Sequence, residues 1–211
     1  MERFTDRKDA GRRLAARLAE RDWEGPIVLA LPRGGVPVAA EVARALGTEL
    51  DVLVVRKLGV PGHEEVAMGA IGEDGATVLN DDVIGMGAIS ASAVVAARER
   101  EGGEVERRVG LLREGRPAPG LAGRTAIVVD DGIATGATAR AGCAIARTRG
   151  AAHVILAVPV APPDAAAHVP EADELVCVLT PASLMSVGMH YIDFAQVSDD
   201  EVVEQLRAFR A

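Results

Sequence analysis

The chain has 211 residues and a formal net charge of −8, and 49% of its residues are hydrophobic although only 2% are aromatic. This length predicts one domain with a large core of Ala, Val, Leu and Ile, and it excludes a small disulfide-dependent scaffold. The acidic balance argues against a nucleic-acid-binding surface, and no stretch is apolar over the length that a membrane span needs.

The cysteines and the first residues indicate the compartment. Cys143 and Cys177 fall in a predicted helix and a predicted strand without metal-ligand spacing, so we interpret them as small buried residues in a reducing environment. The charged N-terminus lacks the apolar core of a signal peptide. We expect a cytoplasmic protein whose partners include neither nucleic acid nor membrane.

Short Val- and Ile-rich runs alternate with Ala-rich stretches of helical periodicity, which predicts an α/β fold: an open, mostly parallel sheet with helices on both faces. The expected single domain covers residues 1–211, with a core at about 26–180, a small hood at about 180–197 and a C-terminal helix at 198–209. In chain order we predict a helix at 6–20, a strand at 27–31, a helix at 38–46, a strand at 51–56, a mobile loop at 57–65, a hairpin of 66–71 with 77–79, a helix at 90–113 interrupted at the glycines 102 and 103, a strand at 126–129, a helix at 137–149, and strands at 153–159 and 174–179.

The first predicted strand ends in the sequence Leu-Pro-Arg-Gly-Gly-Val-Pro at 31–37. Gly34 and Gly35 can offer backbone N–H groups to an anion without a side chain in the way, and Arg33 adds a fixed positive charge. A diphosphate would fit this loop. The alternative is an ordinary tight turn between strand and helix.

A basic pair, Arg56 and Lys57, follows the second predicted strand. These side chains either reach an anionic ligand or form a solvated pair at a strand end. Glycine and proline density after Lys57 predicts a loop that moves.

The segment 126–138 is the most informative motif, because a buried apolar run stops at Asp130 and Asp131 and continues into a turn of small residues. A helix follows this turn, so its unpaired N–H groups and positive dipole end favour a phosphate. The two carboxylates suit neutral hydroxyls, a Mg2+ ion, or both. Together these features describe a ribose 5-phosphate. The alternative is a Rossmann-like strand and turn with an incidental acidic pair.

This segment resembles the 5-phosphoribosyl-1-pyrophosphate (PRPP) signature of type I phosphoribosyltransferases, except that the family usually has an aliphatic residue at the position of Gly132. The resemblance implies that Asp130 and Asp131 face the ribose hydroxyls and, directly or through them, Mg2+. It also implies a 5-phosphate loop made by Ala134, Thr135, Gly136, Ala137 and Thr138.

Two further segments resemble the same family. Residues 31–37 are similar to its pyrophosphate loop, where a cis peptide is common, and that bond would fall here at or beside Arg33. Residues 55–62 look like the arginine-lysine segment before the flexible loop in the adenine-type branch, which implies that Arg56 and Lys57 reach the pyrophosphate or the base. Closure of residues 57–68 over the ligand would then exclude water.

Residues 187–194 loosely resemble the hood that reads the base in this superfamily. Tyr191 or Phe194 would stack on a ring, and Asp193 would accept a hydrogen bond from it. The equal alternative is that the two aromatic residues only hold the C-terminal helix. Ala134 stands where the hypoxanthine-guanine branch has an aspartate, so the motif is closer to the adenine- or orotate-like variant.

The resemblance implies a Mg2+-dependent enzyme that transfers the 5-phosphoribosyl group from PRPP to a nitrogenous base or a related nitrogen nucleophile and releases pyrophosphate. Its catalytic residues would be Arg33, Lys57, Asp130 and Asp131. The alternative is a non-catalytic regulator that senses PRPP or nucleotides on the same fold. The expected partners are PRPP and a small-molecule acceptor, and assembly into a homo-oligomer stays open.

Overall fold

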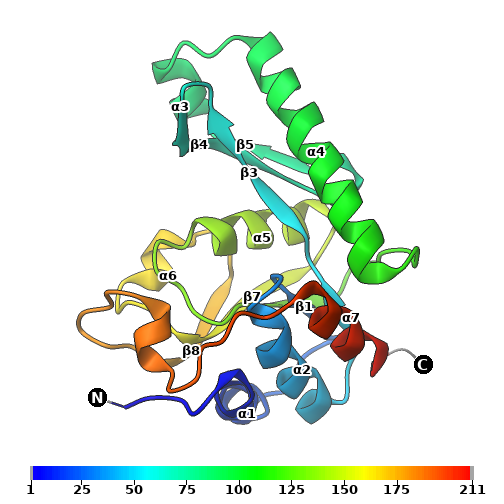
Figure 1. Ribbon diagram of the computed structural model, residues 1–211, viewed down its shortest axis with the longest axis vertical. Coiled ribbons are helices and arrows are strands. Elements are labelled where there is room, and N and C mark those ends of the chain that lie inside the picture. Colours follow the sequence, from blue (N-terminus) through cyan, green and yellow to red (C-terminus); the bar gives the residue numbers. More distant parts are fainter. Residues whose placement is uncertain (1, 210–211) are drawn as a thin grey trace.

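A five-stranded parallel sheet forms the centre of the computed structural model, which describes residues 2–209 and, for Glu65, only the backbone (Figure 1). The strand order is β2-β1-β6-β7-β8, and every neighbouring pair runs parallel, as predicted. The strands are β1 (Ile27–Ala30), β2 (Leu50–Val52), β6 (Thr125–Val129), β7 (His153–Val160) and β8 (Glu174–Leu179).

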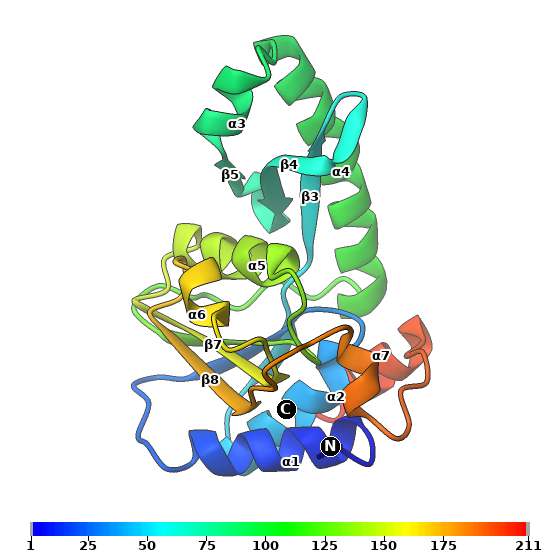
Figure 2. The same cartoon turned by 90° about the vertical axis from the view of Figure 1, so that its left-hand side faces the viewer.

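Helices cover both faces of this sheet, because successive residues of its strands point to opposite sides. Val28 and Ala30 join one buried cluster, and Ile27 and Leu29 join the other. Figures 1 and 2 show α1 (Arg7–Leu18) and α2 (Gly35–Leu46) on one face and α5 (Ala137–Thr148) on the opposite face. The predicted layered α/β architecture is therefore confirmed.

Three antiparallel strands form a second sheet, β3 (Val55–Val60), β4 (His63–Gly72) and β5 (Thr77–Leu79), which stands above the central sheet in Figure 1. Two helices, α3 (Asp81–Met86) and α4 (Ala91–Arg113), complete this part of the molecule, which we call the arm (residues 55–113). The predicted hairpin is present as the β4–β5 pair, joined through the short 3-10 helix η1 (Glu73–Gly75). The sequence did not predict α3.

Two expectations about the arm are wrong. The predicted strand at 51–56 is divided between β2 and β3, which belong to different sheets, and the predicted loop at 57–65 is a hairpin. Two glycines of the second sheet permit close strand contact. A Cβ on Gly59 would lie 2.8 Å from the carbonyl oxygen of Glu64 in β4, and one on Gly69 would lie 2.5 Å from that of Val78 in β5. Gly62, at the hairpin turn, instead uses the positive φ that favours glycine.

The long helix α4 continues through Gly102 and Gly103, contrary to the predicted interruption. A Cβ on Gly102 would lie 3.3 Å from the Cδ1 atom of Ile71, so this glycine brings the helix close to β4. The helical cost of glycine, about 1 kcal/mol each, is small beside the packing of the helix on the sheet.

The C-terminal part includes the short helices α6 (Ala165–His168) and η2 (Val187–His190) and ends in α7 (Asp199–Arg207). The helix α7 begins with a capping box formed by Ser198 and Glu201. Within residues 2–209, the structure contains no helix with the length and apolar character that crossing a membrane requires.

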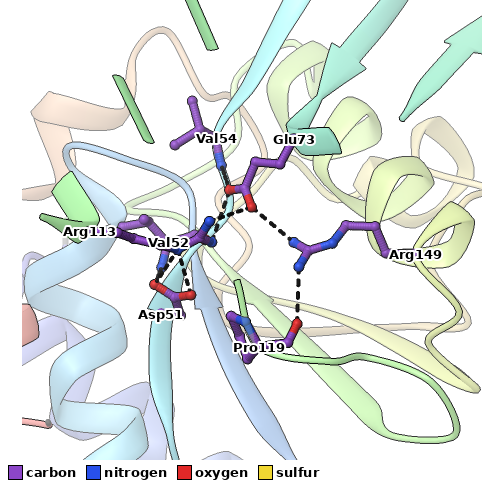
Figure 3. A network of polar contacts seen from close by, with 7 residues as sticks. All are labelled: Asp51, Val52, Val54, Glu73, Arg113, Pro119 and Arg149. Carbon is purple, nitrogen blue, oxygen red and sulfur yellow. Dashed lines mark hydrogen bonds and ion pairs between the residues drawn. The ribbon is translucent and has the colours of Figure 1, made fainter. Parts of the chain in front are cut away.

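A buried ionic network joins the arm to the central sheet (Figure 3). Arg113, at the end of α4, donates to Asp51 Oδ2 at 2.8 Å, to Glu73 Oε2 at 2.6 Å and to the Val52 carbonyl at 2.8 Å. Glu73 also accepts from the Val54 backbone N–H at 3.1 Å and from Arg149 at 3.3 Å. These contacts surround the segment in which the chain leaves β2 and enters β3, so they fix the start of β3.

We expect Arg113→Ala to lower the free energy of unfolding by roughly 3–5 kcal/mol, because it leaves the carboxylate of Glu73 buried with only part of its compensation. Glu73 is 3% exposed, so water cannot replace the lost guanidinium. Urea denaturation measures this change.

The matched control is Arg107→Ala on the same helix, where the side chain is exposed and pairs with Glu104. Its free energy of unfolding should equal that of the wild type within error. Similar losses in both variants would contradict a structural role for the buried network.

Candidate functional site

Two loops meet at the carboxyl edge of the central sheet because β1 and β6 are parallel neighbours. The first loop, residues 31–34, connects β1 to α2, and the second, residues 130–136, connects β6 to α5. The Leu31 N–H donates to the Val129 carbonyl at 2.8 Å, which extends the strand pairing into both loops. Motifs far apart in the sequence thus form one site.

The glycines of the first loop allow this close approach. A Cβ on Gly34 would lie 2.1 Å from Asp131 Oδ2, and one on Gly35 would lie 2.6 Å from the Val129 carbonyl oxygen. The peptide bond between Pro32 and Arg33 is cis, as the resemblance implied. Gly34 and Gly35 therefore have a packing role. The N–H group of Gly35, which was predicted to face an anion, instead donates to the Leu31 carbonyl at 3.1 Å.

The two carboxylates of the second loop differ in their surroundings. Asp130 Oδ1 accepts the Asp131 backbone N–H at 2.9 Å, and Asp131 Oδ2 accepts from Arg7 Nε at 2.9 Å. Burial, followed by the charge of Asp131, raises the pKa of Asp130 well above its ordinary range. Burial also raises the pKa of Asp131, although the Arg7 guanidinium opposes this change.

The remainder of the second loop exposes its backbone at the N-terminus of α5. Ala134, Thr135, Ala137 and Thr138 are exposed, and Gly136, with φ of 78°, precedes the helix without a side-chain cap. The first N–H groups of α5 are therefore not capped by the preceding side chain, as an anion-binding helix start requires.

Gly132, the departure from the family pattern, has a packing explanation. A Cβ there would lie 2.6 Å from Val187 and 2.8 Å from Val160, and its φ of 156° disfavours other residues. The side chain of Val187, from η2, fills the space that an aliphatic residue would need.

An arginine-rich cleft of about 530 Å3 opens beside the two loops. Its lining includes Asp131 and Thr138 of the second loop and Gly34 of the first, with the guanidinium-bearing residues Arg7, Arg33, Arg56 and Arg108. Arg33 and Arg108 approach the carboxylate of Asp199, at 4.0 and 3.2 Å. Sequence reasoning missed Arg7 and Arg108, which lie on helices where arginine is an ordinary surface residue.

The side chains of Arg56 and Lys57 line different clefts. Arg56 lines the arginine-rich cleft, whereas Lys57 lines a second cleft of about 570 Å3 between the arm and α5. Adjacent residues of a strand point to opposite faces, and β3 includes both. Arg33 and Lys57, predicted to be catalytic together, thus line different clefts.

Tyr191 does not lie where it could stack on a base. The residue is 3% exposed, its ring packs on Phe4 and Phe194 at centroid distances of 5.3 and 4.8 Å, and its hydroxyl donates to the Asp131 carbonyl at 2.6 Å. Burial raises the pKa of this hydroxyl. The arrangement favours the alternative role, in which the aromatic residues hold the C-terminal segment.

Asp193, the other residue predicted to read the base, is exposed and accepts the Ala195 backbone N–H at 3.0 Å. It lines a third cavity and is absent from the lining of the arginine-rich cleft. Phe194 does line that cleft, with the Arg7 guanidinium 3.9 Å above its ring.

The parallel sheet, the acidic pair and the exposed helix start define an α/β protein with a candidate anion-binding site at the carboxyl edge of its strands. Residues 2–180 match the family model described as "Phosphoribosyl transferase domain", and the chain belongs to this family. The narrower likeness to the adenine- or orotate-like variant stays a prediction.

The chain is 55% identical over 212 residues to the Mycobacterium tuberculosis protein named "Putative phosphoribosyl transferase Rv0571c". The alignment includes 100% of this chain and 48% of that protein, so the chain spans about half the length of this relative.

Two solved structures share the fold. TT1426 from Thermus thermophilus is 41% identical, with a TM-score of 0.91 over 99% of this chain and 100% of that one. A Neisseria gonorrhoeae hypothetical protein with bound ppGpp has a TM-score of 0.50 and 13% identity over 100% and 99% of the two chains, and it shares the fold alone.

We expect Gly34→Ala to destabilise the protein by roughly 1–3 kcal/mol, because the added methyl group meets an Asp131 carboxylate that Arg7 holds in place. Gly103→Ala is the control, since nothing lies within 4 Å of its added Cβ and it sits inside α4. That control should gain roughly 0.5–1 kcal/mol from its helix propensity. Chemical denaturation of both variants checks the pair, and an unchanged Gly34→Ala protein would contradict the close approach of the two loops.

We expect Asp130→Asn to raise the free energy of unfolding near pH 7 by roughly 0.5–2 kcal/mol. A carboxyl whose pKa is higher in the folded than in the unfolded state loses stability as pH rises from its unfolded value of 3.8 through its folded value. Asparagine removes the charge and keeps an oxygen that accepts the Asp131 N–H.

Thermal unfolding at several pH values measures this gain, which should shrink at acidic pH, where the carboxyl is protonated in both states. Asp164→Asn, at an exposed position, should leave the melting temperature unchanged. A lower melting temperature for Asp130→Asn at neutral pH would contradict the raised pKa.

Proposed function

We propose that this protein binds PRPP with Mg2+ and transfers its 5-phosphoribosyl group to a nitrogen nucleophile, releasing pyrophosphate. The observation that carries the proposal is the meeting of the two loops. An uncapped helix start, two carboxylates and the Arg33 loop follow one another along a single edge of the sheet. A pentose with a phosphate at one end and a diphosphate at the other presents its groups in this order.

Each part of the ligand would have its own set of protein partners, chosen by charge. The N–H groups of residues 134–138 and the hydroxyls of Thr135 and Thr138 would bind the 5-phosphate, and Asp130 and Asp131 would accept from the ribose hydroxyls. Arg33 and the N–H group of Gly34 would hold the diphosphate, whereas the N–H group of Gly35 donates to the Leu31 carbonyl at 3.1 Å. Charge-assisted hydrogen bonds contribute about 1.5–3 kcal/mol each, so this set would bind a polyanion firmly.

The donor set fits a Mg2+ ion that arrives with the ligand. Within residues 2–209, no group of three or more His, Cys, Asp or Glu is arranged to hold a metal. Mg2+ commonly binds through one or two carboxylates together with substrate phosphates, and the Asp130 and Asp131 oxygens would supply the carboxylates. Their raised pKa values favour a partner that brings positive charge. When bound, Mg2+ neutralises charge on the diphosphate.

Catalysis by this chain would be mainly electrostatic. Cleavage of the bond at C1 of the ribose leaves positive charge on the sugar and negative charge on the departing diphosphate. Arg33 and the loop N–H groups would stabilise the leaving diphosphate, and the carboxylates of Asp130 and Asp131 would orient the ribose through its hydroxyls. Lys57 lines the second cleft, apart from Arg33, so it would not take part in stabilising the leaving diphosphate.

We expect the double variant Asp130→Asn with Asp131→Asn to lose PRPP binding by at least about 100-fold, because two charge-assisted contacts are removed. Calorimetric titration with PRPP and Mg2+ measures the affinity. The control removes two exposed acidic charges after α1, Glu20→Gln with Asp22→Asn, and should bind as the wild type does. Unchanged affinity in the first variant would overturn the assignment of the acidic pair.

Turnover is tested by pyrophosphate release from PRPP and Mg2+ across a panel of nitrogenous bases and related nucleophiles. Release with one acceptor class supports the transferase and names its substrate. Binding without release for any acceptor would overturn the transferase and favour the sensing regulator that we keep as the alternative.

A further inference from the structure

We infer that Arg7, the first residue of α1, is a positioning residue that orients the Asp131 carboxylate, so that the N-terminal segment forms part of the site. The inference rests on the proposed function, because it concerns how Asp131 meets the ligand. Arg7 lies 124 positions before Asp131 in the chain and belongs to neither motif.

Arg7 contacts Asp131 through two of its nitrogen atoms. Nε donates to Oδ2 at 2.9 Å, and Nη2 lies 2.8 Å from the same oxygen. The side chains are only 11% and 15% exposed, so water screens this pair weakly. The contact fixes one carboxylate oxygen, and among residues 2–209 no described hydrogen bond engages the other, Oδ1.

The third nitrogen and one face of Arg7 are also engaged. Nη1 donates to the Ala195 carbonyl at 2.7 Å, and the guanidinium lies 3.9 Å above the Phe194 ring. All three nitrogens therefore have protein partners, which leaves Arg7 little capacity to bind a phosphate itself. Arg33 differs, because its side chain is 34% exposed and its described carboxylate partner, Asp199, is 4.0 Å away.

The main chain around Arg7 holds the same loop from a second direction. Phe4 N–H donates to His190 at 2.8 Å, and the N–H groups of Ile192 and Asp193 donate back to Phe4 and Thr5 at 2.8 and 2.9 Å. Tyr191, inside this pairing, donates its hydroxyl to the Asp131 carbonyl. Residues 4–7 and 190–195 thus hold both the backbone and the side chain of Asp131.

A double-mutant cycle on PRPP binding tests the inference, with Arg7→Ala, Asp131→Asn and the combined variant titrated in the presence of Mg2+. We expect Arg7→Ala to weaken binding roughly 10- to 100-fold in the wild-type background and less than about threefold in the Asp131→Asn background. Arg7→Lys retains a donor and a charge near Oδ2 and should recover part of the lost affinity.

Arg12→Ala is the matched control, because Arg12 lies on the same helix, is 64% exposed and pairs with Glu41 at 3.5 Å. It should bind PRPP like the wild type. Circular dichroism and thermal unfolding of each variant report on folding, and the Arg7→Lys protein keeps the test informative if Arg7→Ala is unstable.

The outcomes separate the two claims. The inference is supported if the wild type binds PRPP and Arg7→Ala weakens this binding in the wild-type background but not in the Asp131→Asn background. An equal loss in both backgrounds overturns it, because Arg7 would then act on the ligand directly or through the general fold. Failure of the wild type to bind PRPP overturns the proposed function, and the inference with it.

Discussion

The parallel pairing of β1 with β6 is the constraint on which the candidate site depends. It places the loop after β1 against the loop after β6, and the two glycines at 34 and 35 let them approach to a distance that a side chain would prevent. A shift in this pairing would separate Arg33 from the acidic pair. The sheet core, which is buried on both faces, therefore also determines the spacing of the chemical groups.

Charge is distributed unevenly over this acidic protein. The net charge of −8 belongs to the whole chain, whereas four arginines line one cleft at the edge of the sheet. Such a local concentration of arginines favours an anionic ligand at this edge under the proposed function. The raised pKa values of Asp130 and Asp131 show that burial disfavours their unpaired negative charges at this edge.

The sequence predicted the motifs that are local in the chain. A buried apolar run, two acids and small residues predicted the strand, turn and helix around 126–138, and the segment 31–37 was predicted to connect the first strand to the next helix. Both depend on residues that are neighbours in sequence. The roles of these residues toward a ligand stay predictions.

Contacts between distant residues could not be predicted in this way. In the sequence, Arg7 is one charged residue on the polar face of a predicted helix. Its contact with Asp131 is seen only in the folded structure. Gly59 was interpreted as part of a loop because the sequence does not show that the backbone of Glu64 lies 2.8 Å from the position of its missing Cβ. Tyr191 was misplaced for the same reason, since its partners Phe4 and Asp131 come from other parts of the chain.

Because side chains alternate along β3, this strand places Arg56 in the arginine-rich cleft and Lys57 in the second cleft. Its pairing with β4 is regular from Val55 to Leu58 and becomes irregular only after that point. Insertion or loss of one residue between Val52 and Arg56 would shift the register of β3 by one position. The guanidinium of Arg56 and the ammonium of Lys57 would then exchange clefts. The length of the segment between β2 and β3 therefore decides which basic side chain lines which cleft. A relative with a segment one residue longer or shorter would have the two basic side chains in opposite clefts, even if the residues themselves were identical.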